Sequence, residues 1–206
     1  VPTQVVGKSP SPEKSFGRQV TYDADEHTSS QFGQVILQIA DMSPITAIGA
    51  LKTAEERFKA TPDALLPQAD QILNSCTAQL ELLFSVHLGD ADTVKVGEAV
   101  RLCKHLLGFV LQIFKNETFS ARASPDVLQT TVKSLLTHVQ DPQLSQMVEG
   151  KQVTRALNCI ILKILQSGEP NLALEMLLNI FGSCFSGTVD TADTNMILLV
   201  QRCLWK

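Results

Sequence analysis

Apolar residues recur every three to four positions from Gln31 almost to the end of the chain, and no segment alternates apolar and polar residues as a strand does. This spacing places the apolar side chains of each segment along one face of a helix. We therefore predict an all-α fold in which about eight helices follow one another. Their predicted ranges, to within a few residues, are 31–40, 44–60, 62–88, 92–116, 123–139, 143–167, 170–186 and 192–206.

Five of the predicted helices start at the same kind of dipeptide, a polar residue followed by proline. The polar side chain can accept a hydrogen bond from the first helical turn, and proline fits the first position because no partner is needed there for its missing N–H. We expect these dipeptides to mark helix N-termini: Ser43-Pro44, Thr61-Pro62, Ser124-Pro125, Asp141-Pro142 and Glu169-Pro170.

The connections between consecutive predicted helices are short, which favours antiparallel neighbours. The length of a helix pair overlaps the HEAT and armadillo repeat length of about 40–47 residues, although no consensus residue recurs at a fixed period. We predict an antiparallel, HEAT-like stack, with an irregular helical bundle as the alternative. The expected pairs are 31–60, 62–116, 123–167 and 170–206.

Residues 1–29 have no sustained periodicity and are rich in Pro, Ser, Gly and charged residues. Such a segment cannot bury enough surface to offset the entropy of ordering, so we predict a flexible linker before a helical domain at 30–206. Ser9 and Ser11 are each followed by proline, as at sites of proline-directed kinases, or they simply reflect a disordered composition. The chain begins without Met and ends within an apolar pattern, so we expect part of a longer protein, with the domain cut at its C-terminal end.

Charge and hydropathy argue against two classes of partner. The formal net charge is −4 and no basic run is longer than two residues, which argues against a surface for nucleic acid or anionic membranes. The longest unbroken apolar run, Met196 to Val200, is far shorter than the roughly 20 residues of a membrane span. We expect neither nucleic acid nor membrane as a partner.

Cysteine and histidine are the residues most suited to chemistry, but their spacing does not support it. The five cysteines fall within apolar helical patterns, which indicates reduced thiols in the core. Cys103 and His105 are two apart on a predicted helix, so they point in nearly opposite directions and cannot act together. His87 and His138 lie near predicted helix C-termini, where imidazole interacts well with the helix dipole. We expect no catalysis, no cofactor and no metal.

Aspartate recurs in or beside the turns predicted inside the helix pairs. If the pairs stack, these turns line one edge of the array, and that edge is acidic. The alternative is that aspartate is simply a good turn and capping residue. The candidate residues of an acidic partner edge are Asp41, Asp90, Asp92, Asp141 and Asp190.

The segment EGKQVTRALNCIILKILQSGEPNLALEMLLNIF, from Glu149 to Phe181, and the final LLVQRCLWK resemble the C-terminal domain of the mini spindles/ch-TOG family of microtubule polymerases. The resemblance begins near Gln31, so it covers nearly all of the helical part and leaves out the linker. The strongest matches are Glu149, Gly150, Gln152, Val153, Arg155, Asn158, Lys163, Cys203, Leu204 and Trp205.

The resemblance implies a TOG-related helical module at the end of a protein whose other TOG domains bind αβ-tubulin. In the family this last module docks the polymerase to adaptors, above all to coiled-coil TACC proteins. The implied location is the cytoplasm and cytoskeleton, at centrosomes, spindle microtubules and microtubule plus ends during mitosis.

The first predicted turn departs from a tubulin-binding TOG domain, which presents Trp there and basic residues along later turns. Here that turn reads Ala40-Asp41-Met42-Ser43 and the later turns are acidic, so like charges would weaken binding to the acidic surface of tubulin. Two functions stay open. One is adaptor docking, in which a groove or an apolar patch near the C-terminal end receives an amphipathic helix. The other is tubulin or microtubule-lattice binding through scattered helix lysines and the linker residues Lys8, Lys14 and Arg18.

Overall fold

Two layers of antiparallel helices make up the computed structural model of this chain, which describes residues 22–88, 93–167, 170–185 and 191–205. Within these ranges the regular structure is entirely helical, so the all-α prediction is confirmed. The helices are α1 (Tyr22–Ile39), α2 (Pro44–Ala60), the 3₁₀ helix η1 (Pro62–Gln68), α3 (Ala69–Leu82), the π-helix η2 (Leu83–His87), α4 (Thr93–Lys115), α5 (Glu117–Arg122), α6 (Pro125–Val139), α7 (Gln143–Gln146), α8 (Gly150–Ser167), α9 (Pro170–Ser183) and α10 (Thr191–Leu204).

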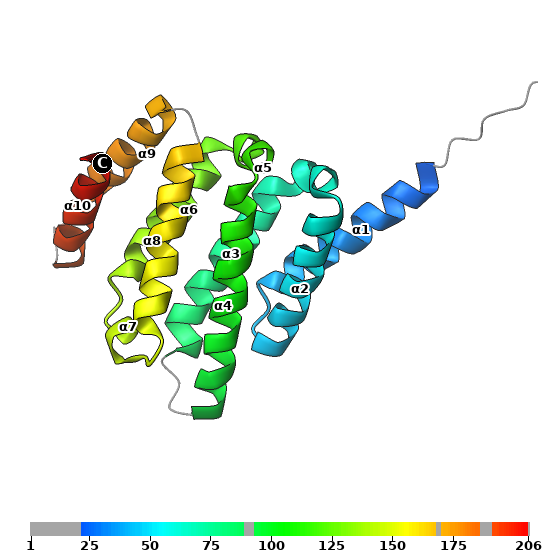
Figure 1. Cartoon of the computed structure of the whole chain (residues 1–206), viewed down its shortest axis with the longest axis horizontal. Coiled ribbons are helices and arrows are strands. Elements are labelled where there is room, and N and C mark those ends of the chain that lie inside the picture. The colour runs from blue at the N-terminus through cyan, green and yellow to red at the C-terminus, as the bar shows by residue number, and fades with distance from the viewer. Residues whose placement is uncertain (1–21, 89–92, 168–169, 186–190, 206) are drawn as a thin grey trace, which may run out of the picture.

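The layers follow from how the helices pair. The predicted pairs are present as α1 with α2, α3 with α4, α6 with α8 and α9 with α10, each packed together. Helices α1, α3, α6 and α9 contact one another in that order and form the first layer. Helices α2, α4 and α8 do the same in the second layer, which faces the viewer in Figure 1.

The predicted helix at 62–88 is three elements. Pro67 lies inside its first part and has no N–H for an α-helical bond, and the residues up to Gln68 form a 3₁₀ helix. At its far end the Leu88 N–H donates to the carbonyl oxygen of Leu83 at 3.0 Å, five residues back, which defines the π-turn. The spacing of apolar residues does not distinguish these variants from an α-helix.

One further helix and one interruption of a predicted helix were not predicted. Asn116 ends α4 and starts the short α5, because its side chain accepts a hydrogen bond from the Phe119 N–H at 3.0 Å. The predicted helix at 143–167 is divided into α7 and α8 by Met147, whose φ of −79° and ψ of 138° are extended.

Helix α1 begins at Tyr22, so the first helix starts earlier than the predicted Gln31. The residues before Gln31 lack the three-to-four-residue apolar spacing of the later helices, so periodicity did not extend the predicted helix to them. The rest of the predicted linker, with Ser9 and Ser11, lies outside the described residues.

The proline dipeptides mark helix starts as predicted, but the polar residues act in different ways. Ser43 caps α2 by accepting from the Thr46 N–H at 3.4 Å. Thr61 and Ser124 make no side-chain cap. Instead, the Ser124 N–H donates to a carboxylate oxygen of Asp70 at 2.8 Å, which ties the start of α6 to α3.

None of the five cysteines is in a disulfide, and the prediction that all belong to the core is wrong for one of them. Cys76, Cys103 and Cys184 are buried, and Cys203 is half-buried. Burial raises the pKa of both Cys76 and Cys103 to about 12, so these thiols stay protonated and unreactive. Cys159 is exposed on α8, although the apolar residues around it placed it on the inner face.

Candidate protein-docking groove

Helix α10 does not extend the second layer along α8. It packs on α9 and touches α6, and an open groove of about 990 Å³ lies between it and the α6–α8 pair. Figure 1 shows the α9–α10 pair at one end of the stack, inclined to the other helices. The groove is lined by Leu136 and Val139 of α6, by Asn158, Ile161 and Leu162 of α8, and by Leu198, Leu199, Gln201, Arg202, Cys203 and Trp205 at the end of the chain.

The groove has an aliphatic floor and a polar rim. Its floor consists mainly of leucine, isoleucine and valine side chains, while Asn158, Gln201 and Arg202 contribute polar groups. Two of its large apolar residues are open to solvent, since Trp205 is 90% exposed and Leu198 is 50% exposed. Grooves of this kind bind the apolar face of a partner helix, with the rim groups selecting its polar flanks.

The sequence signal for this groove is the apolar run Met196 to Val200. Five consecutive residues spread around a helix, so they cannot all face one neighbour. Met196 and Val200 are buried, whereas Leu198 lines the groove and is half exposed. The run therefore serves two surfaces, one that holds α10 in place and one that lines the groove.

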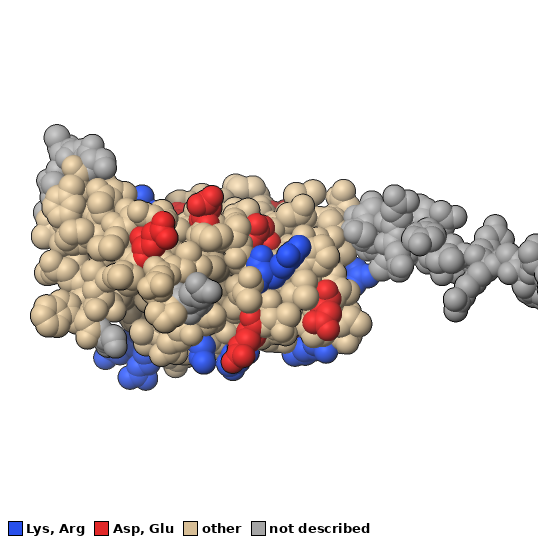
Figure 2. All heavy atoms as spheres, turned by 90° about the horizontal axis from the view of Figure 1, so that it is seen from above, with Lys and Arg blue, Asp and Glu red and all other residues tan. Residues whose placement is uncertain are grey.

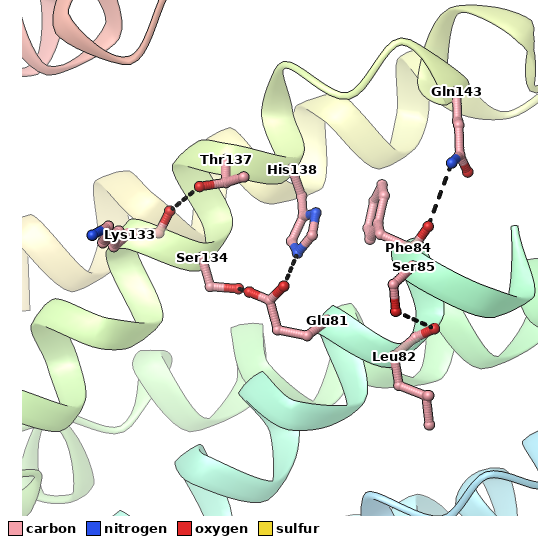
Figure 3. A network of polar contacts seen from close by, with 9 residues as sticks. All are labelled: Glu81, Leu82, Phe84, Ser85, Lys133, Ser134, Thr137, His138 and Gln143. Carbon is pink, nitrogen blue, oxygen red and sulfur yellow. Dashed lines mark hydrogen bonds and ion pairs between the residues drawn. The ribbon is translucent and has the colours of Figure 1, made fainter. Parts of the chain in front are cut away.

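A polar cluster between α3 and α6, in which Ser134 and His138 are buried and Glu81 is exposed, fixes the helix that forms the groove floor. In Figure 3 the carboxylate of Glu81 on α3 meets two side chains of α6: it accepts a hydrogen bond from the Ser134 hydroxyl and lies 3.2 Å from His138 Nε2. The imidazole also stacks on the ring of Phe84, with 4.2 Å between ring centroids. The Gln143 side chain donates to the Phe84 carbonyl oxygen at 3.4 Å, within the π-turn. These contacts hold the end of α6 against α3.

His138 lies in the last turn of α6 as predicted, and it is also buried and in contact with Glu81. Burial lowers its pKa below the usual 6.5, although the carboxylates of Glu81 and Asp141 act in the opposite direction. The unfolded chain then binds a proton more readily than the folded one as the pH falls below 6.5. Stability from this residue is present above that pH and is lost on acidification.

We expect the free energy of unfolding to fall as the pH drops from 7 to 5, and the fall to be smaller in His138→Gln, which keeps a donor toward Glu81. The measurement is urea unfolding at a series of pH values. Glu81→Gln supplies the opposite control, because removing the carboxylate lowers the folded-state pKa of His138 further and extends the loss to lower pH. If the free energy of unfolding of His138→Gln fell with pH as steeply as that of the parent, His138 would not be the source of the pH dependence.

The predicted acidic edge is described at two of its five residues. The turn between α1 and α2 and the turn between α6 and α7 both lie along the lower edge of Figure 1. In each turn the aspartate accepts from the backbone N–H two residues on: Ser43 N lies 2.7 Å from Asp41 Oδ1, and Gln143 N lies 2.8 Å from Asp141 Oδ1. The structure thus gives these carboxylates a local turn role. Asp90, Asp92 and Asp190 lie outside the described residues.

Several residues on which the sequence resemblance rests lie next to the groove-forming helices. Glu149, just before α8, forms an ion pair with Lys104 of α4 at 2.7 Å. The adjacent Gly150 lies directly against α7, where no side chain has room. Asn158 and Trp205 line the groove. The motif therefore combines residues that fix the α7–α8 turn with residues of the groove.

Among the described residues, no group of three His, Cys, Asp or Glu side chains is placed so that it could hold a metal ion. Among the same residues, no helix has the length and apolar character needed to cross a membrane.

By its fold and its groove, this chain belongs to the class of helical stacks that present an open apolar surface. The chain is similar to protein MOR1 of Arabidopsis thaliana and to protein MOR1 of Oryza sativa subsp. japonica, each 25% identical over 118 residues, or 57% of this chain. It spans 6% of the length of each of these relatives. No family model and no solved structure matches the chain. The similarity supports the microtubule-associated TOG family indicated by the sequence motif, without singling out mini spindles or any other member.

Proposed function

We propose that this chain is a non-catalytic docking module of a microtubule-associated polymerase. The groove between α8 and α10 receives an amphipathic helix from a coiled-coil adaptor of the TACC type, which places the polymerase at centrosomes, spindle microtubules and microtubule plus ends. The observation that carries the proposal is the aliphatic groove of about 990 Å³, with its exposed Trp205 and Leu198.

The size of the groove suits a helix. Residues 198–205 of its outer wall span roughly 10 Å along the chain at about 1.5 Å per residue, which is about two helical turns. An amphipathic helix presents apolar residues three and four positions apart over such a length. Arg202 on the rim favours a partner helix with acidic residues beside its apolar stripe.

The test is a titration of this chain with a recombinant TACC-type coiled coil, followed by calorimetry. We expect saturable binding with a negative heat-capacity change, because apolar surface is removed from water on both partners. Absence of binding at micromolar concentrations would contradict the proposal, as would binding of similar strength to an unrelated coiled coil of matched charge.

The alternative function is direct binding of tubulin or of the microtubule lattice, and the similarity to MOR1 is the observation that favours it. The aspartates of the α1–α2 and α6–α7 turns argue against the TOG mode, since they would present like charge to an acidic partner. We therefore expect no co-elution of this chain with free tubulin at physiological salt. Co-sedimentation with microtubules, with and without residues 1–21, which precede α1, separates lattice binding by the N-terminal segment from binding by the helices.

A further inference from the structure

Charge is distributed unequally between the two helix layers. Where side chains are described, the first-layer helices carry the acidic residues Asp70, Glu81, Asp126 and Glu175 and one base, Lys133. The second layer and α10 carry three acids, Glu55, Glu56 and Glu98. The basic residues of the second layer and α10 are Lys52, Arg57, Lys59, Arg101, Lys104, Lys115, Lys151, Arg155, Lys163 and Arg202.

Figure 2 views the stack from above and shows this asymmetry directly. Lys and Arg atoms gather along the lower margin of the picture, which is the second-layer face turned toward the viewer in Figure 1. An acidic chain with a net charge of −4 thus presents one basic face. The basic face does not correspond to a contiguous basic run in the sequence, because each helix contributes its basic residues separately.

The centre of the basic face lies on the neighbouring helices α4 and α8. All charged residues of α8, namely Lys151, Arg155 and Lys163, are basic and exposed. On α4 the side chains of Arg101 and Lys115 are exposed in the same layer. In the described part of the chain, the Lys/Arg–carboxylate ion pairs join Lys59 to Glu55 and Lys104 to Glu149, so these five cations have no acidic partner there.

We infer that the exposed face of α4 and α8 binds an acidic polypeptide segment. Five cations without acidic partners attract carboxylates, and the neutral exposed side chains of Gln152 and Gln166 on the same helix as three of them can bond to a peptide backbone. Among the described residues, the face carries no exposed Phe, Tyr or Trp side chain on which bases would stack, which argues against a single-stranded nucleic acid as its partner. The inference is independent of the groove between α8 and α10.

The test measures fluorescence anisotropy of a labelled poly-L-glutamate peptide added to the whole chain at low and at physiological salt. The basic-face variant is Lys151→Gln/Arg155→Gln/Lys163→Gln. The control is Lys133→Gln/Gln34→Glu/Gln71→Glu on the exposed first layer, which changes the net charge by the same amount. Exposed ion pairs each contribute modestly, so we expect about tenfold weaker binding in the basic-face variant and less than about twofold in the control.

Three outcomes would overturn the inference: no binding of poly-L-glutamate at low salt, equal weakening in the two variants, or tighter binding of a single-stranded DNA oligomer or of phosphatidylserine vesicles than of poly-L-glutamate. The adaptor titration is unaffected by any of them. Loss of adaptor binding with poly-L-glutamate binding intact would contradict only the docking proposal, and the reverse would contradict only the basic face.

Discussion

Replacing Gly150 by alanine should destabilise the domain by about 3 kcal/mol or more, at the upper end of the usual cost of overpacking. A Cβ at this position would overlap the carbonyl oxygen of Leu144 and lie 2.7 Å from its carbonyl carbon. These are backbone atoms, so α7 and α8 must separate to make room. Their separation would also displace Glu149 from Lys104. Chemical unfolding followed by circular dichroism measures the change.

Gly108 provides the matched control. It is exposed in the middle of α4, and a Cβ there meets nothing within 4 Å. Gly108→Ala should therefore raise stability by about 0.5–1 kcal/mol through helix propensity alone. Equal stability of the two variants would show that the close approach of α7 to α8 is absent in solution.

The second large effect concerns the groove. Leu198→Asp combined with Trp205→Ala removes its two most exposed apolar side chains, and we expect the adaptor coiled coil to bind at least about 100-fold more weakly. Both residues are at least half exposed, so the fold should tolerate the change. Calorimetric titration gives the affinity, and unfolding curves confirm that the variant is folded.

The matched control changes similar residues far from the groove. Leu37→Asp with Met42→Ala alters side chains that are 66% and 63% exposed at the first helix pair. This variant should bind the adaptor as the parent does. If it loses tubulin binding, or if the groove variant binds the adaptor normally, the alternative function is favoured over docking.

Helix starts were the part of the fold that the sequence predicted best. The starts of α2 and α9 at Pro44 and Pro170 match the predicted positions, because proline fits the first helical turn whatever packs around it. The start of α1 at Tyr22 was missed, since its first turns have no apolar face. The π-turn at Leu83–His87 was missed because contacts between helices accompany it, such as that of Gln143 with Phe84.

The candidate site was less predictable than the fold. The sequence located an apolar surface near the C-terminal end, and the run from Met196 to Val200 shows why. The groove forms because α10 packs on α9 and α6 instead of along α8. The spacing of apolar residues within one helix does not indicate which neighbours that helix packs on. The basic face likewise requires α4 and α8 to be neighbours, although they are separate segments of the chain.

The most direct test of the docking account is an amide chemical-shift map of the isotopically labelled domain titrated with the TACC-type coiled coil. The account predicts that the perturbed amides cluster at residues 136–139, 158–162 and 198–205, around the groove. Perturbations centred instead on the α1–α2 and α6–α7 turns, or none at saturating adaptor, would contradict it.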